Sequence, residues 1–172
     1  MRYSSSAQTQ SVNLKNDIGR NEKLLKKYRF GFDAAGALLF LLVMIPNFIW
    51  FAVPAPNDVL RKESATALMD VIASVCQVLF VASLCVLINT KRDKLKLSPL
   101  IIASIVCIGV YFLGWVFYYI GIVNSAVILS LTLPPCFAFI LFSLDRKNRI
   151  AMIPAICFTV CHFIYGMVNY IL

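Results

Sequence analysis

Residues 99–143, PLIIASIVCIGVYFLGWVFYYIGIVNSAVILSLTLPPCFAFILFS, decide the fold of this chain. The stretch contains no charged side chain. As one helix rising about 1.5 Å per residue it would be roughly twice as long as the hydrocarbon core of a membrane is thick, about 30 Å. Gly121–Asn124, an uncharged turn signal, lies near its centre. The stretch therefore predicts two membrane-spanning helices, about 99–121 and 123–143.

Three further apolar runs flank this pair, at about 30–53, 66–90 and 150–172. Hydrophobic residues make up 60% of the chain and charged residues 14%, and the mean hydropathy is +0.83. Such values lie outside the range of soluble domains, and no polar stretch is long enough to build one. We therefore predict an all-α integral membrane bundle of five transmembrane helices over residues 29–172. The preceding segment, residues 1–28, is expected to be polar, cytoplasmic and partly disordered.

Lysine and arginine are distributed unequally between the two sides of this bundle. Fourteen lie in the N-terminal segment and in the connections at residues 91–96 and 146–149, whereas the connection between the first two spans has only Arg61 and Lys62. Cytoplasmic loops collect basic residues. The sequence thus predicts a cytoplasmic N-terminus and an extracytoplasmic C-terminus, in a plasma membrane that we expect to be bacterial.

The net charge of +8 could indicate either a nucleic acid or a membrane surface as partner. Because the basic residues adjoin the ends of the spans, we expect them to meet anionic inner-leaflet lipid headgroups, and we expect no nucleic acid. An odd number of spans contains no two equal halves, so a transporter of this kind would need a homo-oligomer or a partner membrane subunit. The segment 21–30, NEKLLKKYRF, is interpreted either as a helix on the membrane surface or as an extension of the first span.

The six cysteines all lie inside apolar runs, and no CxxC pair exists. Cys157 and Cys161 lie one turn apart on one helix, where a disulfide is geometrically poor, and only His162 lies near them as a further metal ligand. We interpret the cysteines as packing residues and expect neither a metal nor another cofactor. The sequence also contains none of the common hydrolase, metalloprotease or phosphate-loop motifs, so we do not expect an enzyme.

Polar and aromatic side chains recur at helical spacing within three of the spans. Residues at spacings of three or four share one face of a helix. The stripes are Asp70, Ser74 and Gln77 in the second span, Tyr111, Trp115 and Tyr118 in the third, and Thr159, His162, Tyr165 and Asn169 in the fifth.

The predicted topology brings most of these stripes, with Asn47 of the first span, into the outer half of the membrane. Polar groups at such depth normally face the bundle interior or a wet cavity. We therefore predict an outward-facing ligand site lined by Asn47, Asp70, Gln77, Tyr118, His162, Tyr165 and Asn169. The alternative is that these side chains only hold helices together, while Trp50, Tyr119 and Tyr170 are interfacial anchors.

Asp70 and His162 carry the most specific hypothesis. A carboxylate beside a histidine favours the charged imidazole, which would permit a proton-linked step. The alternative for Asp70 is a hydrated carboxylate close to the membrane surface. Prolines inside the spans, at positions 46, 134, 135 and 154, are typical of kinked helices that border a binding site. The connection PAPND, residues 54–58, is expected to be an ordered turn that acts as a lid or as a contact surface.

Three classes of function remain, and an enzyme is the least expected of them because no catalytic motif is present. The first is a small transporter or solute-binding membrane subunit that uses the outer cavity. The second is a non-catalytic membrane interaction protein with a sensory or immunity role. Small residues that would mark helix contacts, among them Gly31, Gly36, Gly109, Gly114 and Gly166, do not form a strict GxxxG motif, so no dimer contact is specified.

Overall fold

The computed structural model describes residues 27–61, 65–92 and 94–171. This part of the chain contains five long helices, α2 (Ala34–Ala52), α3 (Ala67–Val86), α4 (Pro99–Tyr119), α5 (Ser125–Asp145) and α6 (Arg149–Tyr170). By length and composition, all five are able to cross a membrane. The expected multi-pass helical membrane protein is confirmed to that extent, and the orientation of its termini stays a prediction.

Side-chain caps explain where four of the helices begin. Asp33, Ser98, Asn124 and Asn148 each accept a hydrogen bond from a backbone N–H in the first turn of α2, α4, α5 and α6. These bonds satisfy amides that have no partner within the helix. Ser98 and Asn148 lie in the charged connections, and Asp33 and Asn124 lie at the start of the apolar runs whose helices they cap.

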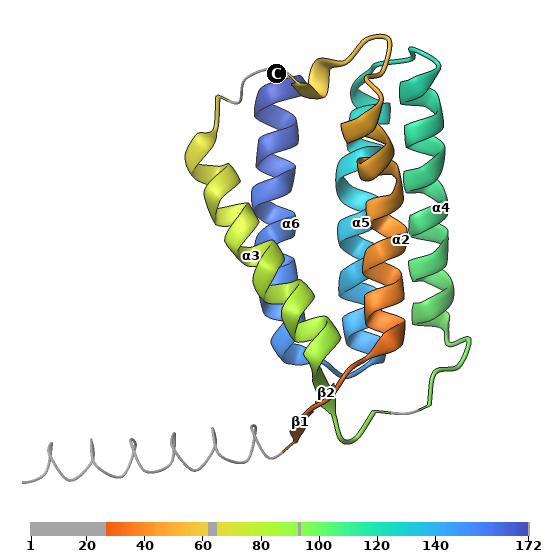
Figure 1. The fold of residues 1–172 in the computed structure, drawn as a ribbon, viewed down its shortest axis with the longest axis vertical. Helices are drawn as coiled ribbons and strands as arrows, with labels where there is room; N and C mark the ends of the chain where they lie inside the picture. The colour runs from red at the N-terminus through yellow and green to blue at the C-terminus, as the bar shows by residue number, and fades with distance from the viewer. Residues whose placement is uncertain (1–26, 62–64, 93, 172) are drawn as a thin grey trace, which may run out of the picture.

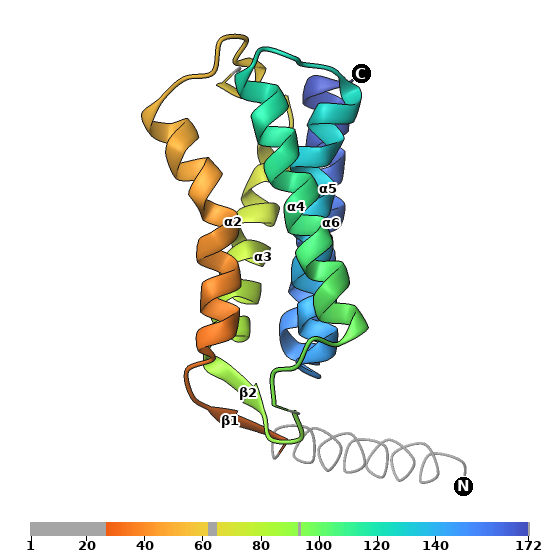
Figure 2. The same ribbon diagram turned by 90° about the vertical axis from the view of Figure 1, so that its right-hand side faces the viewer.

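Four of the helices form a row, and the fifth, α2, packs on one face of that row. The row runs α3, α6, α5, α4, each packing against the next, and α2 contacts α3, α4 and α5 from one face (Figures 1 and 2). Of the apolar window of α5, 56% is buried, against 17–33% in the other four helices. Helix α5 is therefore the centre of the bundle, and most exposed aliphatic side chains of the other helices are available to lipid.

Glycines permit the closest helix contacts. A Cβ added at Gly36 of α2 would lie 2.9 Å from the carbonyl oxygen of Leu84 in α3, and one added at Gly166 of α6 would lie 3.1 Å from Thr132 Oγ1 in α5. Gly114 approaches Ser130 of α5 more closely still. The expectation of helix contacts is confirmed at these positions. It is wrong for Gly109, which has open space around it.

The segment before the first helix is a strand. β1 (Tyr28–Phe30) pairs antiparallel with β2 (Leu87–Asn89), which continues directly from the end of α3. Both interpretations of residues 21–30 as helix are wrong for Tyr28–Phe30, and residues 21–26 lie outside the described part of the chain. The backbone groups of each strand hydrogen-bond to the other strand. The segments before α2 and after α3 therefore form a two-stranded ribbon. The first two spans are correspondingly shorter than the apolar runs.

A buried charge cluster closes the end of the bundle that carries this ribbon, here called the strand end. Asp33 pairs with Arg92 of the α3–α4 connection, and its Oδ2 lies 3.6 Å from Nε of Arg146, which follows α5. Asp33 and Arg146 are each only 6% exposed. The opposite end, here called the η1 end, carries the 3-10 helix η1 (Val59–Arg61), the α4–α5 turn and the C-terminus (Figure 1).

Asparagines extend the closure of the strand end. Asn148 donates to the carbonyls of Ser83 and Leu87, at 3.0 and 2.9 Å, and Asn89 donates to the carbonyl of Lys147 at 2.7 Å. These bonds join the α5–α6 connection to the end of α3 and to β2. The strand end is therefore held by many polar bonds.

Candidate functional site

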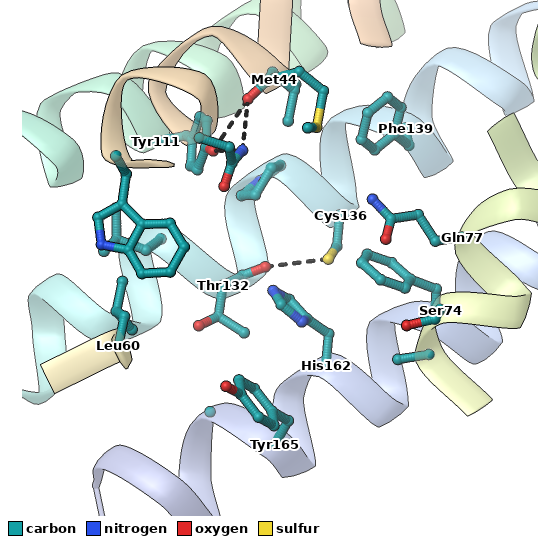
Figure 3. A pocket seen from close by; sticks show the side chains of 18 of the residues that line it. Met44, Leu60, Ser74, Gln77, Tyr111, Thr132, Cys136, Phe139, His162 and Tyr165 are labelled. Carbon is teal, nitrogen blue, oxygen red and sulfur yellow. Dashed lines mark hydrogen bonds between the residues drawn. The ribbon is translucent and has the colours of Figure 1, made fainter. Parts of the chain in front are cut away.

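A cavity of about 450 Å³ lies inside the bundle. Residues of all five helices line it, together with Leu60 of η1 (Figure 3). It reaches from η1 to the middle of the bundle, where Phe80, Phe139 and Phe158 line it. Its volume falls within the range of small-molecule sites, about 300–1,000 Å³.

Ten of the 25 residues that line the cavity are phenylalanine, tyrosine or tryptophan. Trp50 and Phe40 come from α2, Tyr111 and Trp115 from α4, and Phe158, Tyr165 and Tyr170 from α6, with further phenylalanines from the other helices. Trp115 meets Tyr111 edge-on, with ring centroids 6.3 Å apart. Rings in this density give a cavity that favours an apolar or aromatic ligand body.

His162 lies in a column of stacked rings on α6. Its ring lies 5.0 Å from that of Phe158 and 6.1 Å from that of Tyr165, with interplanar angles of 15° and 9°. Figure 3 shows the imidazole pointing into the cavity between Thr132 and Tyr165. No hydrogen bond is recorded for this imidazole among the described residues, so its nitrogens face the cavity without a protein partner.

Asp70 and Gln77 approach the same space from α3. Asp70 is in the first turn of the helix, where a carboxylate also favours the helix dipole. Asp70 acts electrostatically on His162, yet neither a hydrogen bond nor an ion pair is recorded between these two described residues. The pairing of Asp70 with His162 stays a prediction, now with both residues on one cavity wall.

The opposite wall holds polar groups that bond one another. Asn47 donates to the hydroxyl of Tyr111 at 2.8 Å and to the carbonyl of Val43 at 3.1 Å, and Tyr111 donates to that same carbonyl at 3.1 Å. Trp115 is only 6% exposed and packs edge-on against Tyr111. Its Nε1 is buried away from the cavity, so this wall offers a ligand an aromatic surface.

Hydroxyl and thiol groups on the wall are mostly satisfied within their own helices. Ser74 donates to the carbonyl of Asp70 at 2.8 Å, and Thr132 to that of Ile128 at 2.7 Å. Cys136 donates to the carbonyl of Thr132 at 3.1 Å. These groups shape the cavity, but their protons are already donated within the helix. They are therefore less available for hydrogen bonds to a ligand than the side chains of Gln77 and His162.

Five of the seven predicted site residues line the cavity: Asn47, Asp70, Gln77, His162 and Tyr165. Tyr118 and Asn169 do not. Tyr118 is fully buried and donates to Asp58 Oδ1 at 2.8 Å, and Asn169 bonds Ala65 N and Thr66 Oγ1 beside the start of α3. Both join helices to connections at the η1 end.

Several lining residues escaped the sequence analysis. Trp50 and Tyr170 resemble interfacial anchors in sequence, but both face the cavity. Thr132 and Cys136 come from α5, whose apolar residues surround the helix, so its sequence carries no face signal. The only available clue was Pro134–Pro135, which does not identify the neighbouring side chains.

The connection between α2 and α3 covers the cavity at the η1 end. Asp58 accepts hydrogen bonds from Trp50 Nε1 at 3.0 Å and Tyr118 Oη at 2.8 Å, and pairs with Arg61 Nε at 2.8 Å. Arg61 also lies over the Trp50 ring, 4.8 Å from its centroid. The ordered turn predicted for PAPND is present, and the cap formed by residues 57–61 (the η1 cap) rests on α2 and α4.

The pKa of Asp58 reflects this environment. Burial raises it, but the bonds from Trp50, Tyr118 and Arg61 outweigh burial, and the pKa lies below its ordinary value of 3.8. Asp58 is therefore ionised at neutral pH. The carboxylate that ties the η1 cap is already occupied by protein donors, in contrast to that of Asp70.

Metal ligation has no geometric support in the described residues, where no three His, Cys, Asp or Glu side chains cluster to hold an ion. The six cysteines are free thiols. Binding of a small organic molecule is thus the chemistry that this arrangement supports best.

The chain matches no protein-family model, no curated protein and no solved structure.

Proposed function

We propose that this protein is a small-solute transporter, or a solute-binding subunit of one, that binds its ligand in the cavity of the helix bundle. The observation that carries the proposal is the cavity itself: about 450 Å³ within a membrane bundle, lined by residues of all five helices and by the side chains of Asp70, Gln77 and His162.

Polar contacts close both ends of the bundle, and this defines what transport would have to open. The Asp33 cluster and the asparagine bonds hold the strand end, and the bonds of Asp58 hold the η1 cap over the other end. A solute would enter past this cap, which the predicted topology places outside the cell. Passage to the other side would require the Asp33 cluster to open.

A ligand screen with a matched pair of variants tests this function. Ser74 lies on the cavity wall, whereas the next residue, Val75, is 55% exposed on the outer surface of the same helix. Ser74→Phe should fill the cavity and Val75→Phe should not. We expect compounds from a metabolite panel to raise the thermal unfolding midpoint of the wild type and of Val75→Phe, and to leave Ser74→Phe unchanged.

The second candidate is a non-catalytic interaction protein, and the order of the η1 cap favours it. Asn57 donates to the carbonyl of Gly121 at 3.0 Å, which joins the two connections at this end into one exposed surface. Failure of the whole panel to shift the wild-type midpoint would favour this second function over the first.

A further inference from the structure

We infer that the cavity is selective for a small organic monocation with an apolar or aromatic body. This inference rests on the proposed function and deepens it by naming the chemical class of the ligand.

The first support is the charge of the wall. Asp70 carries the only formal charge among the described lining residues, none of which is lysine or arginine. The nearby Arg61 is engaged by Asp58 and by the carbonyl of Trp50. In a membrane interior, a carboxylate without a cationic partner attracts a positive charge strongly, because little water screens it.

The second support is the aromatic composition of the wall that Asp70 shares. Tyr165 and Tyr170 line the same cavity from α6, the helix that packs against the helix of Asp70. Aromatic rings attract ammonium groups, most strongly where water is excluded. An anionic ligand would be repelled by the charge of Asp70, whereas a cation is attracted by it and is favoured by the rings.

The third support is size. About 450 Å³ is far more than an inorganic cation needs, and the described residues hold no ligand cluster for a metal. A charged group at Asp70 therefore leaves most of the volume to be filled by apolar atoms. An organic ammonium with a hydrocarbon or aromatic body meets both requirements.

Three compounds with one skeleton test the charge preference: phenylbutylammonium, phenylbutanol and phenylbutyrate. Both tryptophans of the chain line the cavity, so the intrinsic fluorescence of the full-length protein in detergent reports occupancy. We expect the ammonium to bind roughly tenfold more tightly than the alcohol, and the carboxylate to bind least.

Variants assign the preference to Asp70. Asp70→Asn should reduce the ratio of ammonium to alcohol affinity to about one, while Asp70→Glu should keep it. Asp145→Asn removes the same charge at the strand end, where this carboxylate bonds Ser98, and should leave the ratio unchanged. Each variant is first checked for an unaltered elution volume and a cooperative thermal transition, and Asp70→Glu keeps the test valid if Asp70→Asn fails to fold.

The possible failures are distinguishable. Equal binding of the ammonium and the alcohol, or a charge preference that survives in Asp70→Asn, overturns the cation inference while a solute-binding cavity stands. If metabolites shift the unfolding midpoint but no cation does, the inference is again wrong and the proposed function stands. If neither the metabolites nor the three probes bind, both are wrong.

Discussion

The indole Nε1 of Trp50 lies 3.0 Å from each carboxylate oxygen of Asp58. This contact joins the middle of the α2–α3 connection to a ring that itself lines the cavity. The same carboxylate accepts the hydroxyl of Tyr118 and pairs with Arg61. One side chain, 10% exposed, thus fixes the η1 cap to α2 and α4.

Neutralising this carboxylate should loosen the η1 cap. We expect Asp58→Asn to lower the free energy of unfolding by about 1–3 kcal/mol, the range for hydrogen bonds to a charged group. Thermal unfolding in detergent measures the effect, with Asn57→Ala, at an exposed position of the same cap, as the milder comparison. An unchanged midpoint in Asp58→Asn would show that Asp58 does not hold the η1 cap.

The effect of Asp58 should depend on pH with a definite sign. Its pKa is lowered in the folded protein, so its contribution to stability is full above the ordinary value of 3.8 and is lost as the pH falls through the folded value. The difference in unfolding midpoint between wild type and Asp58→Asn should therefore be constant near neutral pH and shrink in acid. A difference that grew on acidification would contradict this assignment.

Gly36 and Gly109 provide a matched pair for helix contacts. Alanine at position 36 would place its Cβ 2.9 Å from the backbone oxygen of Leu84, so α2 or α3 must move, at roughly 1–3 kcal/mol. Alanine at position 109 meets nothing within 4 Å and should stabilise α4 by about 0.5–1 kcal/mol. Chemical unfolding of the two variants should give shifts of opposite sign.

The Asp33 cluster should be the most sensitive polar site at the strand end. Asp33→Asn keeps an acceptor for the cap of α2 but leaves Arg92 and buried Arg146 without their carboxylate, and we expect a loss of about 3–5 kcal/mol. Lys94→Gln, at an exposed position nearby, serves as the control. Comparable stabilities of the two variants would mean that the cluster does not close this end.

Much of the architecture was predictable because hydropathy alone determines which segments can span a membrane. Helical spacing identifies a face, and Asn47, Asp70, Gln77, His162 and Tyr165, which were selected by spacing and by predicted depth, do line one cavity. Spacing does not identify a partner, however, and this is why Tyr118 and Asn169 were assigned to the site although they bond the connections at the η1 end. The pairing of Tyr28–Phe30 with Leu87–Asn89 was also unpredictable, because each segment continues an apolar run and finds its partner far along the chain.

The most direct test of the central claim, that the cavity holds a small solute, is the intrinsic tryptophan fluorescence of the protein. Trp50 and Trp115 are the only tryptophans in the chain, and both line the cavity. Compounds that raise the unfolding midpoint should change this emission saturably in the wild type and in Val75→Phe, and should not do so in Ser74→Phe. Saturable binding that leaves the emission unchanged, or that persists in Ser74→Phe, would contradict a ligand site in this cavity.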